Sequence, residues 1–186
     1  MGKIGIVKYA WVCVYAPVNV VNGRGREEMR KFWNDVNECL RSFNRGTRIV
    51  LIGDMNGRVG SNEIAEVVGK WGVDGINENG EHLVDMCAER GLFLANTFFQ
   101  HKLIHRYTSR RRDERDEQKS MIHYMAVDER LKKDVLDARV VRGMFDGSDH
   151  YAVVAKIQIR GRWEYGKKCK SKGRQVIASE RLDRRG

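Results

Sequence analysis

Features of several common protein classes are missing from this sequence of 186 residues. Its four cysteines, Cys13, Cys39, Cys87 and Cys169, form no CxxC pair, which argues against a zinc site and, in a reducing compartment, against disulfides. No apolar run approaches the roughly 18–20 residues that span a bilayer, and no signal peptide is recognisable at the start. We therefore expect an intracellular protein without a membrane partner. The absence of GxGxxG and GxxxxGK[ST] motifs argues against a nucleotide cofactor.

Positive charge is concentrated at one end of the chain. The net charge is +10, and residues 160–186 hold ten basic against three acidic residues. Such a tail binds polyanions through salt-sensitive phosphate contacts, although an interdomain linker has a similar composition. We expect one domain over residues 1–160, a basic, disordered tail over 161–186, and a nuclear rather than a cytoplasmic location. The tail residues expected to contact nucleic acid are Lys167, Lys168 and Lys170.

Apolar patterns predict a mixed α/β fold. Residues 4–16 are rich in β-branched and aromatic residues, as in a strand, and apolar residues spaced three and four apart predict a helix over 25–44. The apolar run 48–53 predicts a strand covered on both sides. Because strands outnumber helices, we expect an α+β or layered α/β architecture. The other predicted elements are a helix over 80–90 ending at Gly91, strands over 92–96, 120–127, 135–142 and 150–159, helical turns over 128–134, and loops over 54–80 and 110–119.

Polar residues stand at the ends of three predicted strands, where α/β enzymes place catalytic side chains. They are Tyr15 in YAPVN, Asp54 and Asn56 in GDMN, and Asp149 and His150 in GSDH. Each motif alone also has a structural explanation: a core aromatic, a turn and a strand cap, respectively. Their order and spacing together are much more specific.

Taken together, VYAPVN, IGDMN, MIHYMAV and GSDHYAVVA resemble C-terminal motifs of the endonuclease/exonuclease/phosphatase superfamily. The surrounding sequence is similar to that of RTE-like (LINE) retrotransposon endonucleases and of the craniofacial development protein 2-like relatives. The resemblance runs from about residue 4 to 160. It implies a partial DNase I-like, four-layered β-sandwich flanked by helices. It also implies that the first third of the domain, including a metal-binding glutamate, is missing.

The resemblance also implies a role for each motif residue. Asp54 would orient or deprotonate the attacking water, and Asn56 and Tyr15 would hydrogen-bond around the scissile phosphate. His150 would stabilise charge in the transition state, and Asp149 would support it and act as a partial metal ligand. The implied cofactor is Mg²⁺ or Mn²⁺, and the implied partner is DNA.

One position departs from the pattern of the superfamily. His123, in Ile122-His123-Tyr124, stands where the resemblance implies an aspartate that accepts a hydrogen bond from the catalytic histidine. The resemblance implies the fold of a phosphodiester hydrolase of the DNA endonuclease type. Because a histidine supplies no negative charge at this position, we expect its activity to be weak or absent. The alternative is a catalytically dead, transposon-derived protein that binds DNA, chromatin or a protein partner. Further basic residues that could face DNA, within a largely charge-balanced segment, are Arg110, Arg111 and Arg112.

Overall fold

A computed structural model describes residues 7–19, 23–64, 66–112, 117–143 and 147–158. The predicted tail, with Lys167, Lys168 and Lys170, lies outside these ranges. No helix within them is long and apolar enough to cross a membrane.

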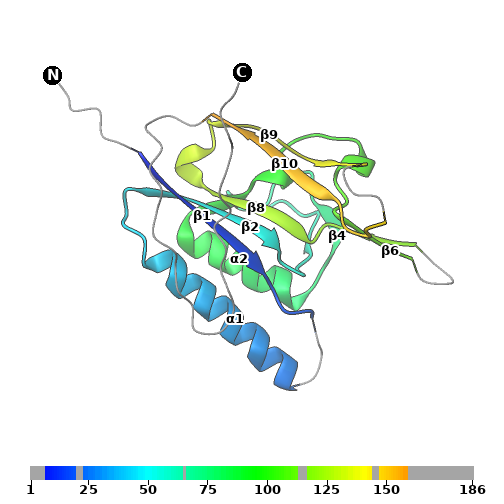
Figure 1. The fold of residues 1–186 in the computed structure, drawn as a ribbon, viewed down its shortest axis with the longest axis horizontal. Coiled ribbons are helices and arrows are strands. Elements are labelled where there is room, and N and C mark those ends of the chain that lie inside the picture. The colour runs from blue at the N-terminus through cyan, green and yellow to red at the C-terminus, as the bar shows by residue number, and fades with distance from the viewer. Residues whose placement is uncertain (1–6, 20–22, 65, 113–116, 144–146, 159–186) are drawn as a thin grey trace.

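Four strands form the central sheet, in the order β1-β2-β8-β5 (Figure 1). β1 (Lys8–Tyr15) runs parallel to β2 (Thr47–Asp54), whereas β8 (His123–Asp128) runs antiparallel to β2 and to β5 (Leu92–Leu94). All four strands are confirmed predictions. The register pairs Tyr15 with Asp54 and Asp54 with His123, so the last residue of β2 lies between the last residue of β1 and the first residue of β8.

Two helices cover one face of this sheet (Figure 1). α1 (Gly23–Arg41) buries a stripe that includes Met29, Trp33 and Leu40 against the sheet, as its three- and four-residue spacing predicts. α2 (Glu78–Arg90) ends at Gly91, whose left-handed φ of 62° confirms the predicted cap. The central core therefore lies between the helices and the sheet.

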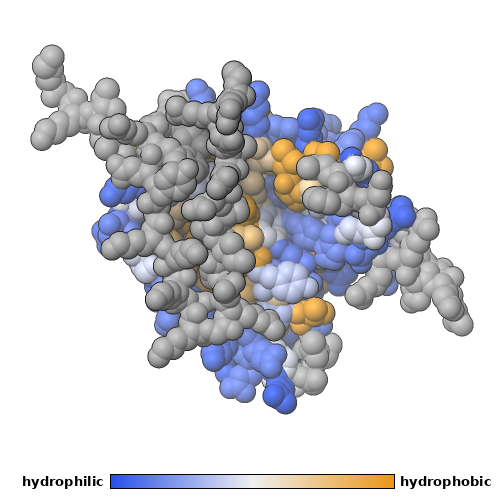
Figure 2. Space-filling model, viewed as in Figure 1, coloured by the Kyte–Doolittle hydropathy of each residue, from blue (hydrophilic) through white to orange (hydrophobic). Residues whose placement is uncertain are grey.

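A second, two-stranded sheet covers the opposite face. β9 (Val135–Val141) and β10 (Ala152–Ile157) pair antiparallel, and Ala138 and Ala155 pack with Phe93 and Val127 of the central sheet. The described residues thus supply three layers of the predicted sandwich: helices, central sheet and second sheet. Apolar side chains are visible on the surface in this region (Figure 2), and Leu136 and Val154 are exposed.

Two segments predicted as loops contain strands. The segment 54–80 holds β3 (Val59–Gly60) and β4 (Val73–Ile76), which pair with each other. The solvated loop expected over 110–119 is wrong, because β6 (Ser109–Arg112) and β7 (Glu117–Ser120) form an antiparallel hairpin. Backbone hydrogen bonds explain why this charged segment forms strands. The Thr108 N–H donates to the Ser120 carbonyl at the base of the hairpin, and the Arg110 N–H donates to the Asp149 carbonyl. The remaining elements are short 3-10 helices: η1 (Ala95–Thr97), η2 (Leu103–His105) and η3 (Glu129–Leu131).

Candidate functional site

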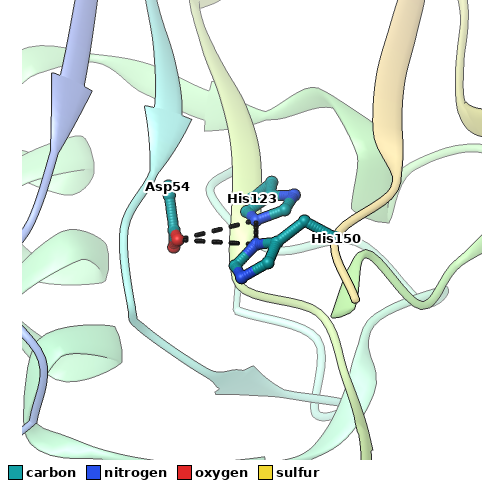
Figure 3. A group of neighbouring side chains, drawn as sticks. All are labelled: Asp54, His123 and His150. Atoms are coloured by element: carbon teal, nitrogen blue, oxygen red, sulfur yellow. Dashed lines mark hydrogen bonds and ion pairs between the residues drawn. The ribbon is translucent and has the colours of Figure 1, made fainter. Parts of the chain in front are cut away.

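Three side chains from distant parts of the sequence meet at the end of the central sheet (Figure 3). Asp54 is the last residue of β2, His123 the first of β8, and His150 lies two residues before β10. His123 Nε2 is 2.7 Å from His150 Nδ1. Asp54 Oδ2 is 3.6 Å from the former nitrogen and 3.8 Å from the latter. Among the described residues, they are the one group of this kind placed to hold a metal ion.

The His123 ring is oriented from both sides. Its Nδ1 lies 3.2 Å from the carbonyl oxygen of Tyr151. A carbonyl oxygen only accepts, so Nδ1 carries the proton, and in the neutral ring Nε2 is an acceptor for His150 Nδ1–H. His123 therefore supplies an orienting acceptor for His150. It does not supply the negative charge that a carboxylate there would provide.

Strand alternation directs His123 into the site. The next residue, Tyr124, points to the opposite face of β8, where it is buried in the main core. Its hydroxyl donates a hydrogen bond of 2.7 Å to the Met121 carbonyl, and burial raises the pKa of the hydroxyl. Because Tyr124 is held on the core face and pairs with Gly53, His123 lies on the other face and pairs with Asp54.

Asp54 combines one satisfied carboxylate oxygen with one unsatisfied oxygen. Oδ1 accepts a 2.9 Å hydrogen bond from the backbone N–H of Asn56. Oδ2 is buried and has no hydrogen-bond partner, and the side chain is only 10% exposed. A buried, uncompensated carboxylate oxygen is costly. Oδ2 faces the two imidazoles, so a positive charge placed there would offset that cost.

The other three predicted site residues lie around this group. Asn56 donates from Nδ2 to the Ala16 carbonyl at 2.8 Å, so its amide is engaged with the backbone. Tyr15 lies beside Asp54 in the sheet but is 62% exposed. Asp149 is 57% exposed, and its Oδ1 is 3.6 Å from His150 Nε2, the ring nitrogen on the side away from His123. Its carboxylate therefore lies outside the three-residue group.

Sequence reasoning missed two asparagines that support the site. Asn77 caps α2 by accepting from Gly80 N at 3.0 Å, and it donates to the Asn56 carbonyl at 3.0 Å. The side chain of Asn79 is fully buried and donates to the Pro17 carbonyl at 2.8 Å. These bonds hold the chain after Asp54 against the start of α2. An asparagine directly before a helix is a capping signal. The helix was predicted to start at residue 80, so Asn77 did not stand at the expected cap position.

The donor atoms of the group do not fit Mg²⁺. This ion is bound by oxygen ligands in near-octahedral geometry at about 2.0–2.1 Å. Asp54, His123 and His150 instead present one carboxylate oxygen and two imidazole nitrogens. Imidazole is a ligand for zinc and other transition metals, whereas carboxylates, carbonyls and water suit magnesium.

Comparison with known proteins finds craniofacial development protein 2 of two mammals among the sequence relatives. No family model matches the sequence. Craniofacial development protein 2 from Tragulus javanicus is 32% identical over 133 residues, which are 72% of this chain and 23% of that protein. The Bos taurus protein is 31% identical over 147 residues, or 79% of this chain and 24% of its own length. The chain thus spans about a quarter of the length of these relatives.

Solved structures resemble the chain in fold. An AP endonuclease from Archaeoglobus fulgidus matches with a TM-score of 0.58 and 15% identity, covering 81% of this chain and 62% of its own. The 3'-5' exonuclease NExo from Neisseria meningitidis gives 0.56 and 18%, covering 80% and 61%. The endonuclease domain of TRAS1, a telomere-specific non-LTR retrotransposon, gives 0.51 and 16%, covering 70% and 52%. The chain is therefore a relative of craniofacial development protein 2 with the fold of the endonuclease/exonuclease/phosphatase superfamily.

Proposed function

We propose that this chain binds DNA at a nuclease-derived site and hydrolyses phosphodiesters weakly or not at all with Mg²⁺ or Mn²⁺. One observation carries the proposal: His123 Nε2 lies 2.7 Å from His150 Nδ1, where the resemblance implies an aspartate. The position of Asp54 supports a hydrolase-derived site, since it faces His150 at the end of the sheet, as the resemblance implies. What differs is the partner of His150: His123 stands in place of a negatively charged aspartate.

Loss of the carboxylate weakens catalysis through charge. Phosphodiester hydrolysis requires an oriented water and stabilisation of negative charge that develops in the transition state. His150 contributes most as an imidazolium, which a directly hydrogen-bonded carboxylate would stabilise. Here its hydrogen-bond partner is the imidazole of His123 at 2.7 Å, and the carboxylates of Asp54 and Asp149 lie farther away, at 3.8 and 3.6 Å. Replacing the triad aspartate of a serine protease with asparagine lowers kcat by roughly 10⁴-fold. A loss of comparable size would leave this site able to bind a phosphate without cleaving it efficiently.

The β6–β7 hairpin supports DNA as the partner. Three consecutive arginines, Arg110–Arg112, form most of β6, and the hairpin projects from the body of the domain (Figure 1). Its backbone is bonded to the site, because Arg110 N donates to the Asp149 carbonyl and Ser109 bridges His150. Similar solved structures include an AP endonuclease and a NExo phosphatase bound to a product DNA hairpin. Arginine side chains bind DNA phosphates well.

The test is fluorescence anisotropy with a labelled DNA duplex and a chelator present. The double variant Arg111→Glu/Arg112→Glu should weaken binding strongly. The matched control, Arg24→Glu/Arg30→Glu on the exposed side of α1, makes the same change in net charge and should weaken binding much less. Equal losses in the two variants, or no binding by the unaltered chain at low salt, would contradict DNA binding at this site.

A nuclear location is proposed together with DNA binding. The sequence basis is the Lys/Arg-rich run around Lys167, Lys168 and Lys170, because short basic runs serve as nuclear localisation signals. Fluorescence microscopy of the tagged chain should show nuclear signal that a Lys→Glu change at these three positions removes. A cytoplasmic signal from the unaltered tagged chain would contradict the proposed location.

A further inference from the structure

We propose that Asp54, His123 and His150 bind a divalent transition-metal ion of the Zn²⁺ class. Such a site differs from the Mg²⁺ site that the resemblance implies, both in its donor atoms and in its use of His123. It requires only three side chains of the described structure and does not depend on DNA binding.

The distances between the donor atoms suit a small metal ion. The three atoms are 2.7, 3.6 and 3.8 Å apart. A triangle with these sides has a point about 2.0 Å from every corner, which matches the roughly 2.0–2.2 Å bonds from zinc to histidine nitrogen and carboxylate oxygen. Calcium bonds of about 2.3–2.6 Å are longer and go to oxygen. One ion can therefore contact all three atoms with little movement of the chain.

A second observation points independently to a bound cation. Asp54 Oδ2 is the buried carboxylate oxygen without a hydrogen-bond partner, on a side chain that is only 10% exposed. Its neighbour Oδ1 is occupied by the Asn56 backbone N–H. A cation bound by Oδ2 and the two imidazoles would satisfy the remaining oxygen, since buried carboxylates are normally paired or bound to metals.

The residues around the group orient its ligands as in known metal sites. Ligating histidines usually donate their second ring N–H to a carbonyl or carboxylate. His123 does so through Nδ1 to the Tyr151 carbonyl, so its Nε2, which accepts from His150 Nδ1 at 2.7 Å, would exchange that hydrogen bond for the metal. When His150 binds through Nδ1, its ring proton occupies Nε2, which lies 3.6 Å from Asp149 Oδ1. Asp149 thereby gains a role as a positioning residue for His150.

The choice of metal follows from the donor set. Two imidazoles and one carboxylate form a known zinc-binding combination of three protein ligands, with a further position open to water or substrate. His150 is 41% exposed, so an open position on its side is accessible. A water or a phosphate oxygen could bind there. The absence of CxxC pairs therefore does not exclude zinc from this chain.

The test is metal binding by the untagged full chain, measured with Zn²⁺ against a chromophoric chelator and with Co²⁺ by visible absorption. We expect one equivalent of Zn²⁺ and a Co²⁺ spectrum without a thiolate charge-transfer band. His123→Asn keeps a donor near the Nδ1 position but removes Nε2. His150→Gln removes Nδ1, and Asp54→Asn removes the negative charge. Each should weaken Zn²⁺ binding by at least about 100-fold, because loss of a mere orienting partner already costs about 10–100-fold.

His101→Asn is the matched control, because His101 Nε2 also pairs with a carboxylate, Asp137 Oδ1, at 2.7 Å. It should leave Zn²⁺ affinity unchanged, and the metal-free variants should unfold in urea like the metal-free chain. Zn²⁺ binding that survives His123→Asn and His150→Gln would overturn the site, as would a thiolate band or displacement of Zn²⁺ by equimolar Mg²⁺. Because the DNA measurement contains a chelator, Zn²⁺ binding without DNA binding would overturn the proposed function alone. DNA binding without Zn²⁺ binding would overturn the metal site alone.

Discussion

The indole N–H of Trp33 donates a 2.9 Å hydrogen bond to the buried Oδ1 of Asn79, which joins the middle of α1 to the first turn of α2. The amide of Asn79 continues from there to the Pro17 carbonyl, just after β1. One fully buried side chain thus connects both helices to the strand that ends beside Asp54. Removing such a side chain lowers the free energy of unfolding, because the buried groups that remain lose their hydrogen-bond partners.

Asn79→Leu should therefore destabilise the fold strongly. It leaves the Trp33 indole and the Pro17 carbonyl without partners, at about 1–3 kcal/mol for each unsatisfied buried group. We expect a loss of roughly 2–5 kcal/mol in the free energy of unfolding, measured by urea denaturation. Asn34→Leu, on the exposed side of α1, should change stability by less than about 0.5 kcal/mol. Similar effects in the two variants would show that the Asn79 bonds contribute little.

Gly53, in the GDMN motif, is required by the approach of β1. A Cβ at Gly53 would lie 1.9 Å from the carbonyl oxygen of Val14, and its φ is +143°. Gly53→Ala should cost at least about 4 kcal/mol or prevent folding, since the clash is with backbone that cannot move aside. Gly46→Ala meets nothing within 4 Å and should change stability by less than about 1 kcal/mol. Expression and urea unfolding of both variants measure the difference, and a stable Gly53→Ala protein would contradict this strand packing.

Glu89 should make the fold sensitive to acid. Hydrogen bonds lower its pKa from the ordinary 4.5 to about 2, first from Arg41 of α1, then from Asn37 and Arg90. Because the folded pKa is depressed, this stabilisation is fully present above pH 4.5 and is lost as the pH falls toward about 2. Glu89→Gln should therefore flatten the fall of the urea midpoint across that range. The exposed Glu27→Gln on α1 should leave the profile unchanged, and an identical profile for Glu89→Gln would argue against the bridge.

Much of the fold was predictable because its strands are compact apolar runs. The continuous run that forms β2 and the helical spacing that forms α1 are local signals, and both elements extend over nearly the predicted residues. The GDMN and SDH motifs also led to Asp54 and His150, since polar residues at strand ends are visible in the sequence. Their meeting with His123 depends on the antiparallel pairing of β2 with β8, and no local pattern encodes this pairing.

The features that were missed depend on contacts between distant residues. Asn79 is buried because α1 and α2 pack together, and its partner Trp33 lies 46 positions away. The β6–β7 hairpin is stabilised by backbone bonds to the segment around Asp149 and His150, which its own charged sequence does not suggest. The unpaired Oδ2 of Asp54 is likewise visible only once the three ligand-bearing elements are assembled.

Salt dependence should show how much the basic tail contributes to DNA binding. For double-stranded DNA, the logarithm of the binding constant falls with the logarithm of salt with a slope of about −0.9 per phosphate neutralised. Lys167→Glu/Lys168→Glu/Lys170→Glu should reduce both the affinity and this slope. The matched control is Lys8→Glu/Lys31→Glu/Lys133→Glu, at exposed positions in the globular part. A slope that changes equally in both variants would show that only net charge matters.

The purified chain should show no Mg²⁺- or Mn²⁺-dependent nicking of supercoiled plasmid above that of Asp54→Ala, the control for contaminating nuclease. Hard cations require correctly placed oxygen ligands, and the assembled group offers only one carboxylate, with two imidazoles in place of further oxygens. In addition, His150 bonds to the imidazole of His123, which carries no negative charge and cannot stabilise the imidazolium as a hydrogen-bonded carboxylate does. Anisotropy measured in the same buffers must show that the DNA is bound, so that a lack of nicking reflects chemistry and not a lack of association. Metal-dependent nicking that disappears in Asp54→Ala would show instead that one carboxylate and two histidines are sufficient for hydrolysis.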